Sequence, residues 1–191
     1  MSAAVDTITI AVQRPHRADA RRNFDALLTA ARTAFAENGT EASLEDIARR
    51  AGVGIGTLYR NFPTRAALIE AVYIDGVEDL VRAATEVASL PPWEALQHWL
   101  WRFVEYAATK KVLIEALNRE SAMIKSCRDA FYNAGEPILK RAQAAGDVRP
   151  DTDIDDVMRL IAGVAGVTFP NAEQRRRVLA MAIDGLRLSK A

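Results

Sequence analysis

Residues 55–62 place side chains that form hydrogen bonds where they could contact a nucleic acid. Leu58 and Phe62 are four residues apart, so they share one face of a helix and are expected to point inward. At roughly 100° per residue, the opposite face then carries small and polar residues: Gly56, Thr57 and Arg60, flanked by Tyr59 and Asn61. Such donors suit phosphate oxygens and base edges, and glycine lets a backbone approach a duplex closely.

This short helix is expected to follow another helix across a tight turn. Ser43 and Asp46 have the spacing of a capping box, and an apolar stripe runs through residues 44–51. Gly52 then predicts the turn, and Pro63 ends the second helix. A two-helix unit with glycine at the bend can place its second helix in the major groove of DNA.

Helical periodicity continues through the rest of the chain. We expect about nine helices, at residues 19–38, 43–51, 55–62, 64–89, 93–109, 111–122, 127–145, 151–169 and 172–188. No convincing strand appears, so the predicted fold class is all-α, with an N-terminal three-helix helix-turn-helix domain and a C-terminal helical domain. The expected divisions are a flexible basic arm at 1–17, the DNA-binding domain at 18–63, and a regulatory, ligand-binding and dimerisation domain at 64–191.

The charge distribution favours the first third of the chain as the part that meets a polyanion. The whole chain is neutral, with 25 basic and 25 acidic side chains, but residues 13–65 hold nine arginines against six acids. Residues 66–150 reverse this balance, with ten basic and twelve acidic side chains. All the basic side chains of the first third are arginines, which can grip phosphate with two hydrogen bonds.

The chemistry-bearing residues are too few to indicate an enzyme. Cys127 is the single cysteine and there are two histidines, so neither a nucleophile with its base nor a metal-ligand set can be recognised. We therefore expect no catalytic residues, no metal and no cofactor. The absence of a long apolar run and of a secretory signal predicts a cytoplasmic protein without membrane contact.

Residues 43–68, SLEDIARRAGVGIGTLYRNFPTRAAL, resemble the DNA-binding signature of the TetR family of regulators. The matching positions are Ser43, Ile47, Ala48, Ala51, Gly52, Val53, Gly56, Thr57, Leu58, Tyr59, Phe62, Pro63, Arg65 and Leu68. Two positions depart from the pattern, because Gly54 replaces a frequent serine cap and Ile55 replaces a frequent lysine or glutamine. Ile55 could contact a thymine methyl group, so the resemblance does not predict the operator sequence.

The resemblance implies how the outward face would divide its contacts. Phosphates would be contacted by Ser43, Thr57, Tyr59 and Arg65. Base edges would be read by Ile55, Gly56, Arg60 and Asn61, with Arg60 directed at guanine and Asn61 at adenine. Arginines before and within the start of the first helix are expected to grip the backbone or enter a minor groove, namely Arg14, Arg17, Arg21 and Arg22.

The C-terminal part is expected to bind an apolar or amphipathic small-molecule effector within residues 93–145 and to form a homodimer. Three aromatic residues are the candidate pocket walls: Trp99, Phe103 and Tyr106. The resemblance implies that the last two helices pair with their copies in a four-helix bundle. The candidate interface residues are Met158, Ile161, Ala165, Leu179, Ile183 and Leu186, with a core inside one chain as the alternative.

Two functional hypotheses follow from these patterns. The first is a repressor that binds a palindromic operator in double-stranded DNA and is released by a small-molecule ligand. The alternative is a DNA-binding regulator without small-molecule induction, either an activator or a corepressor-dependent protein.

Three further patterns have simple structural interpretations. The glycines at 52, 54 and 56 lack the spacing and the preceding strand of a dinucleotide-binding loop. The four aspartates within residues 151–156 lack the glycine and glutamate of a calcium loop, so they indicate an acidic helix start. Cys127 is interpreted as a buried structural thiol, with a redox sensor as the alternative.

Overall fold

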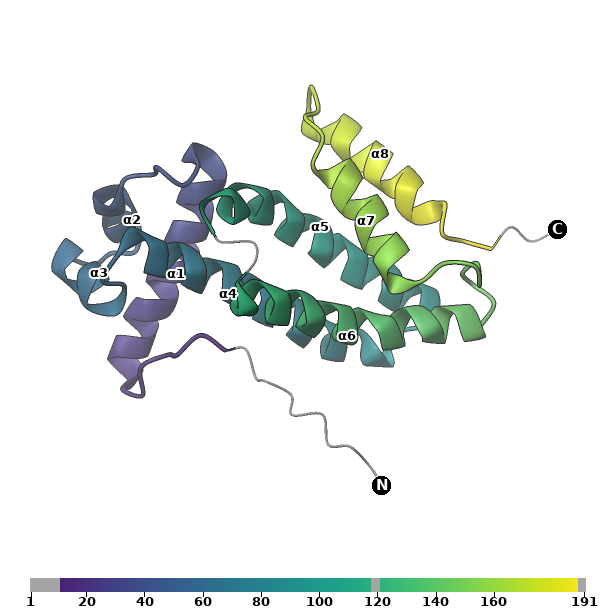
Figure 1. The fold of residues 1–191 in the computed structure, drawn as a ribbon, viewed down its shortest axis with the longest axis horizontal. Helices are drawn as coiled ribbons and strands as arrows, with labels where there is room; N and C mark the ends of the chain where they lie inside the picture. Colours follow the sequence, from purple (N-terminus) through teal and green to yellow (C-terminus); the bar gives the residue numbers. More distant parts are fainter. Residues whose placement is uncertain (1–10, 118–120, 189–191) are drawn as a thin grey trace.

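The computed structural model describes residues 11–117 and 121–188, and most of both segments is helical (Figure 1). The elements are α1 (Ala18–Asn38), α2 (Leu44–Arg50), α3 (Ile55–Asn61), α4 (Arg65–Glu86), the 3₁₀ helix η1 (Val87–Ser89), α5 (Pro92–Ala116), α6 (Ala122–Ala144), α7 (Ile154–Ala165) and α8 (Ala172–Asp184). Within the described segments the only β pairing is an isolated bridge between Val148 and Arg187. The prediction of an all-α fold is confirmed.

Helices α1, α2 and α3 form a small unit at one end of the molecule (Figure 1). Gly52 has a φ of 70°, and the turn after α2 closes with hydrogen bonds from Val53 N to Ala48 O (3.0 Å) and from Gly52 N to Arg49 O (3.1 Å). This is the αL glycine termination of a helix that the sequence predicted. The turn directs α3 away from α2, as a helix-turn-helix unit requires.

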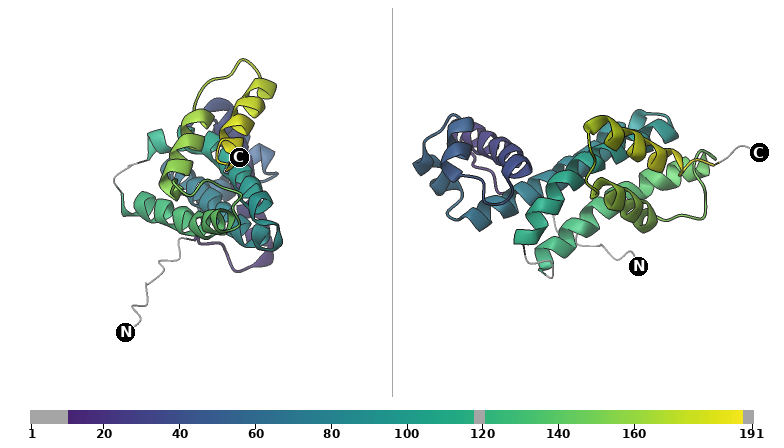
Figure 2. Two further views of the ribbon diagram at one scale, coloured as in Figure 1. Left: turned by 90° about the vertical axis from the view of Figure 1, so that its right-hand side faces the viewer. Right: turned by 90° about the horizontal axis from the view of Figure 1, so that it is seen from above.

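Helices α4, α5 and α6 pack against one another, and α7 and α8 lie over this layer (Figures 1 and 2). Trp99 of α5 is fully buried, and its indole N–H donates to Leu80 O of α4 at 3.0 Å. A side chain at Gly135 of α6 would collide with the Trp99 ring, so this glycine permits the close approach of α5 and α6. Helix α1 also contacts α4 and α5, which joins the N-terminal unit to the rest of the chain.

Helices α7 and α8 are three to four residues shorter than predicted at three of their ends, and larger differences from the sequence prediction lie in α5 and α6. The predicted helices 93–109 and 111–122 are one helix as far as residue 116, because buried Leu113 continues the apolar face of α5 and no residue near 110 breaks a helix. Helix α6 begins five residues before Cys127, where Ser121 accepts a hydrogen bond from Ile124 N at 3.3 Å. Residues 118–120, inside the predicted helix 111–122, lie outside the described segments.

The acidic cluster at residues 151–156 starts α7. Asp153 accepts from Asp156 N at 2.9 Å, and Asp156 accepts from Asp153 N at 3.2 Å, which is a reciprocal capping box. No group of His, Cys, Asp or Glu in the described part of the chain is arranged to hold a metal ion. The interpretation as an acidic helix start is confirmed. Among the described helices, none has the length and apolar character needed to cross a membrane.

Candidate functional site

Helix α3 presents one apolar face to the core and a second face to solvent. Leu58 and Phe62 are buried, and the Phe62 ring lies 4.8 Å from that of Phe24 of α1, which fixes the end of α3. On the outer face Tyr59 is 47% exposed and Ile55 is 37% exposed. The solvent-facing side is therefore the one that the spacing of Leu58 and Phe62 predicts.

The backbone at the start of α3 is open to a large ligand. An added Cβ at Gly54 or at Gly56 would meet no atom within 4 Å, so packing inside the chain does not require glycine at either position. Gly54 is the N-cap residue and has an extended conformation. A duplex could therefore approach the first turn of α3 more closely than side chains would allow.

Two polar side chains of α3, those of Arg60 and Asn61, form hydrogen bonds to atoms of the same helix. Arg60 makes long contacts, from Nε to Gly56 O (3.4 Å) and from an Nη atom to Thr57 Oγ1 (3.3 Å), and it pairs with no carboxylate within the described segments. Asn61 is held more firmly, with its amide donating to Thr57 O at 2.8 Å. The guanidinium of Arg60 can therefore be redirected to a base at little cost.

Ser43 and Arg65, predicted to contact phosphate, also have partners within the chain. The Ser43 hydroxyl accepts from Asp46 N at 3.2 Å and donates to Glu45 at 3.0 Å. The Arg65 guanidinium donates to Thr40 O (2.8 Å) and Ala42 O (2.6 Å), and so ties the start of α4 to the loop between α1 and α2. Both side chains thus hold the helix-turn-helix together, whether or not they also reach DNA.

The basic residues of the arm divide into two groups. Arg17 and Arg21 are exposed and, within the described residues, have no acidic partner. Arg14 instead forms ion pairs with Asp25 (3.0 Å), Glu78 (2.7 Å) and Asp75. Because three carboxylates pair with its guanidinium, Arg14 would have to leave them to reach a phosphate, and its contact with DNA stays a prediction. Residues 1–10 of the predicted arm lie outside the described segments.

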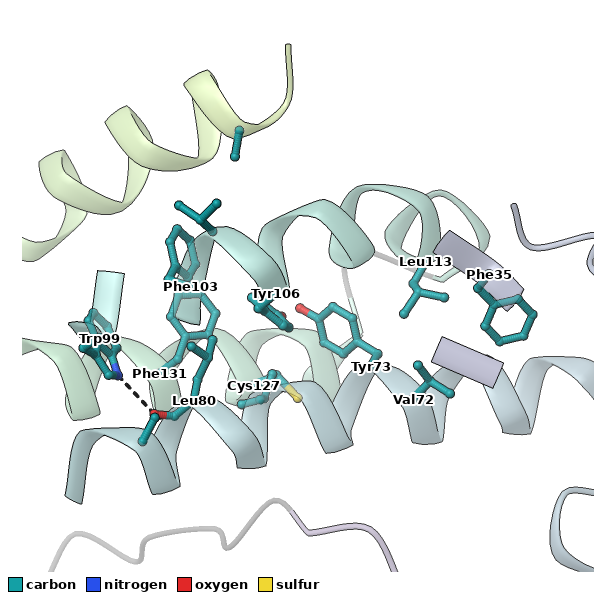
Figure 3. Packing of buried hydrophobic residues seen from close by; sticks show 14 of the residues in the cluster. Phe35, Val72, Tyr73, Leu80, Trp99, Phe103, Tyr106, Leu113, Cys127 and Phe131 are labelled. Carbon is teal, nitrogen blue, oxygen red and sulfur yellow. Dashed lines mark hydrogen bonds between the residues drawn. The ribbon is translucent and has the colours of Figure 1, made fainter. Parts of the chain in front are cut away.

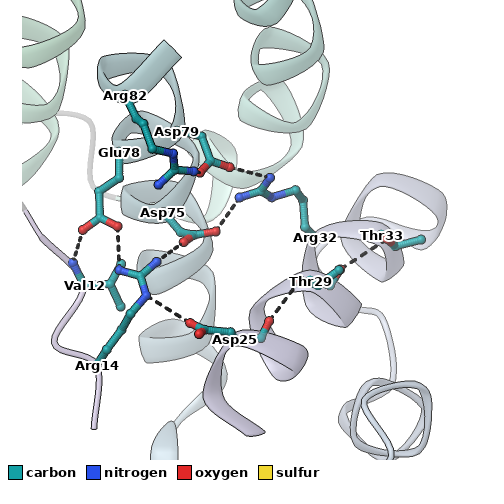
Figure 4. A network of polar contacts seen from close by, with 10 residues as sticks. All are labelled: Val12, Arg14, Asp25, Thr29, Arg32, Thr33, Asp75, Glu78, Asp79 and Arg82. Carbon is teal, nitrogen blue, oxygen red and sulfur yellow. Dashed lines mark hydrogen bonds and ion pairs between the residues drawn. The ribbon is translucent and has the colours of Figure 1, made fainter. Parts of the chain in front are cut away.

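An ion-pair cluster joins the arm and α1 to α4 (Figure 4). Arg32 of α1 donates to Asp79 at 2.9 Å and also to Asp75, while Glu78 accepts from Val12 N at 2.6 Å. Burial raises the pKa of Asp75, and Arg32 and Arg14 act in the opposite direction. The cluster therefore depends on arginines of the N-terminal segment that neutralise a carboxylate of α4.

A cavity of about 220 Å³ lies between α1, α4 and α5. Its described wall consists of Arg32, Val72, Tyr73, Gly76, Asp79, Leu80, Arg102, Glu105, Tyr106, Lys110 and Leu113. Of the three predicted pocket residues, the wall contains only Tyr106. Trp99 and Phe103 are core residues: Trp99 is bonded to Leu80 O, and the Phe103 ring packs against Tyr106 and Phe131 (Figure 3).

The six residues predicted for the dimer interface are all buried inside the single chain: Met158, Ile161, Ala165, Leu179, Ile183 and Leu186. Their burial agrees with the alternative of an intrachain core, and their role in a dimer interface stays a prediction. Helix α7 packs against α5 and α6, and α8 packs against α7, so the apolar stripes of both helices contribute to the core of the chain.

A different set of apolar residues faces outward from α7 and α8. Leu160 of α7 is 42% exposed, Val167 just after the end of α7 is 57% exposed, and Met181 of α8 is 72% exposed. Gly163, between the first two, would meet no atom within 4 Å if it had a side chain. This outer face, defined by these four residues, is open to a partner.

Sequence reasoning missed the charged wall of the cavity and its connection to α1. Arg32 lies in the middle of an amphipathic helix, where an arginine usually faces solvent, and its partners Asp75 and Asp79 are more than 40 residues away. Tyr73 and Lys110 likewise give no signal by spacing, because they lie on different helices. Only their packing brings them together.

Two family models match this chain. Residues 27–72 match the model for bacterial regulatory proteins of the tetR family, and residues 91–188 match the model for the C-terminal domain of SbtR-like transcriptional regulators. The two matches correspond to the helix-turn-helix with the start of α4, and to α5 through α8.

The individual proteins that this chain resembles are also transcriptional regulators. The HTH-type transcriptional repressor KstR2 of Mycolicibacterium smegmatis is 28% identical over 181 residues, which cover 83% of this chain and 82% of the repressor. The crystal structure of a TetR transcriptional regulator from Streptomyces coelicolor has a TM-score of 0.77 and 40% identity, covering 87% of this chain and 99% of that one. A TetR regulatory protein from Mycobacterium vanbaalenii has a TM-score of 0.72 and 36% identity, covering 91% and 100%.

Proposed function

The chain belongs to the TetR family of DNA-binding transcriptional regulators, and we propose that it is a repressor released from its operator by a small molecule. The observation that carries this proposal is the position of Arg32. This side chain belongs to α1 of the N-terminal unit, yet it lines the cavity and pairs with Asp79 and Asp75 of α4. A ligand in the cavity would touch a contact that sets the orientation of the DNA-binding unit.

For DNA recognition we propose that α3 enters the major groove with its exposed face. Ile55, Gly56, Arg60 and Asn61 would meet base edges, while the residues that position the helix on phosphates would be Ser43, Thr57, Tyr59, Arg65, Arg17 and Arg21. The open backbone at Gly54 and Gly56 and the absence of an acidic partner for Arg60 among the described residues support this assignment.

We propose that the protein acts as a homodimer through the outer face of α7 and α8. Leu160, Gly163, Val167 and Met181 would pack against the same residues of a second copy, giving the four-helix bundle expected from the sequence. Two DNA-binding units in such a dimer would meet half-sites about one helical turn, roughly 34 to 36 Å, apart.

Induction would follow from a difference in ligand affinity between two conformations. A ligand that binds better when α1 is displaced from α4 favours a spacing of the two α3 helices that no longer fits the operator. We expect a coupling of about 1 to 3 kcal/mol between ligand and operator. The lever is helix α4, because it begins just after α3 and carries Asp75 and Asp79.

Two titrations test this function. A mobility-shift assay with DNA from upstream of the protein's own coding sequence examines specific binding, and a ligand found by thermal shift is then titrated with and without that DNA. Operator DNA should weaken ligand binding by the same factor by which ligand weakens operator binding. Equal ligand affinity in both titrations would reject induction and favour the regulator without small-molecule control.

A further inference from the structure

The wall of the cavity includes two tyrosines, Tyr73 and Tyr106, whose buried hydroxyls interact with each other. Tyr73 of α4 is 1% exposed and Tyr106 of α5 is 9% exposed, and the hydroxyl oxygen of each is buried. Figure 3 shows the Tyr73 hydroxyl directed towards Tyr106. No other group is within hydrogen-bond distance of either hydroxyl, so even when one donates to the other, one O–H of the pair lacks an acceptor.

Lys110 supplies a positive charge to the same region. Its ammonium lies 5.2 Å from the centre of the Phe131 ring and 5.8 Å from that of Tyr106, and burial lowers its pKa. Tyr73, Tyr106 and Lys110 all belong to the wall of this cavity. Within the described residues Lys110 has no carboxylate partner, so an anion there would meet an unneutralised charge.

The acidic residues of the wall do not compete for this lysine. Asp79 is paired with Arg32 and Arg82, and Glu105 lies 4.0 Å from Arg102. The remainder of the wall includes the apolar side chains of Val72, Leu80 and Leu113 (Figure 3). With Arg32 paired to Asp79 and Arg102 close to Glu105, Lys110 is the cation of the described wall that has no carboxylate partner, and this charge beside apolar sides and two hydroxyls matches an organic anion.

We propose that the effector is a small amphipathic carboxylate, whose oxygens bind Lys110 and the hydroxyls of Tyr73 and Tyr106 and whose apolar tail lies against Val72, Leu80 and Leu113. The volume of about 220 Å³ limits the tail to a short alkyl chain or one aromatic ring. This proposal deepens the function proposed above and rests on it for the role of the ligand, but binding itself can be measured without DNA.

The test uses pairs of probes that differ only in charge. The straight-chain acids from butanoate to octanoate, together with benzoate and phenylacetate, are titrated calorimetrically into the full-length protein, each beside its primary amide. At least one acid should bind at millimolar concentration or below, at least about tenfold more tightly than its amide. Absence of binding by all the acids, or equal affinity of acid and amide, overturns the proposal.

Variants then locate the charge and the hydroxyls. Lys110→Met should weaken binding of that acid roughly 30-fold or more and abolish its preference over the amide, whereas Lys140→Met, an exposed lysine on α6, should change neither. Tyr106→Phe and Tyr73→Phe should weaken binding without lowering the melting temperature of the free protein, because one O–H of this pair lacks an acceptor. Unchanged acid affinity in Lys110→Met would overturn the assignment of the site.

A mobility-shift assay with the same acid distinguishes the carboxylate site from the proposed release of operator DNA by a ligand. If the acid binds but leaves operator affinity unchanged, the carboxylate site stands and the proposed induction fails. If operator binding responds to a different compound and none of the acids binds, induction stands and the carboxylate site is rejected.

Discussion

Arg32 of α1 donates to Asp79 of α4 at 2.9 Å, and both side chains form part of the wall of the same cavity. Arg32 also pairs with Asp75, which is buried and has Arg14 as its other cationic partner. The contact that holds the N-terminal unit on α4 is therefore within reach of any molecule bound in the cavity. A ligand need not act through a long chain of side chains to alter it.

The first prediction concerns this contact. Arg32→Met should lower the free energy of unfolding by about 1 to 2 kcal/mol, because it leaves the Asp75 carboxylate with one partner while Arg32 itself is partly exposed. It should also reduce the effect of a ligand on operator affinity. Urea unfolding and mobility-shift titrations measure the two effects. Arg82→Met is the matched control, since Arg82 pairs with Asp79 in a more exposed position and should cost less than about 0.5 kcal/mol.

The second prediction concerns DNA recognition by α3. Arg60→Ala should relax the preference for one base pair in each half-site, whereas Tyr59→Ala should weaken binding to all sequences by a similar factor. Binding selection from a randomised operator library distinguishes the two results. An unchanged sequence preference for Arg60→Ala would remove this residue from the base-reading set. Affinity of the unaltered protein should fall steeply with salt, because several arginines displace counterions from the duplex.

The sequence predicted the helices and the outward face of α3 well, because both depend on local spacing. Gly52, Pro63 and the four-residue interval from Leu58 to Phe62 determine the turn and the orientation of α3 without reference to distant residues. The charged wall of the cavity depends instead on packing between helices far apart in the chain. No periodicity in α1 distinguishes Arg32 from a solvent-facing arginine.

The burial of most predicted pocket and dimer residues inside the chain has a related reason. Hydrophobic stripes identify which side of a helix is apolar, but they do not tell whether that side meets its own core or another molecule. Trp99 and Ile183 lie on such apolar sides and are fully buried in the core of the chain itself. The surface available to a partner consists of weaker positions such as Met181.

The third prediction tests the outer face of α7 and α8. The double substitution Leu160→Glu and Met181→Glu should convert a dimer of about twice the 21.0 kDa chain into a folded monomer, because charges would oppose one another across the two-fold axis. Light scattering gives the mass and circular dichroism the helix content. Val81→Glu, which changes an exposed apolar residue of α4, should leave the dimer intact.

A charge at Ile183 should act differently. Since Ile183 is fully buried within the chain, Ile183→Arg is expected to destabilise the fold itself by several kcal/mol. Persistence of the dimer in the Leu160 and Met181 double variant would exclude the outer face as the interface.

The fourth prediction concerns the reactivity of Cys127. Burial raises the pKa of its thiol from 9.0 to about 12, with Glu70 and Glu78 acting in the same direction and Lys110 opposing them. At pH 8 roughly one thiol in ten thousand would be ionised, so the folded protein should resist the thiol reagent DTNB and react only when unfolded in urea.

Because the unfolded thiol ionises near 9 and the folded one near 12, unfolding releases a proton between these values, and this group makes stability fall as the pH rises through that interval. Cys127→Ala should remove that part of the alkaline decline. Rapid reaction of the native protein with DTNB at pH 8 would instead show an accessible thiolate and restore the redox-sensor interpretation.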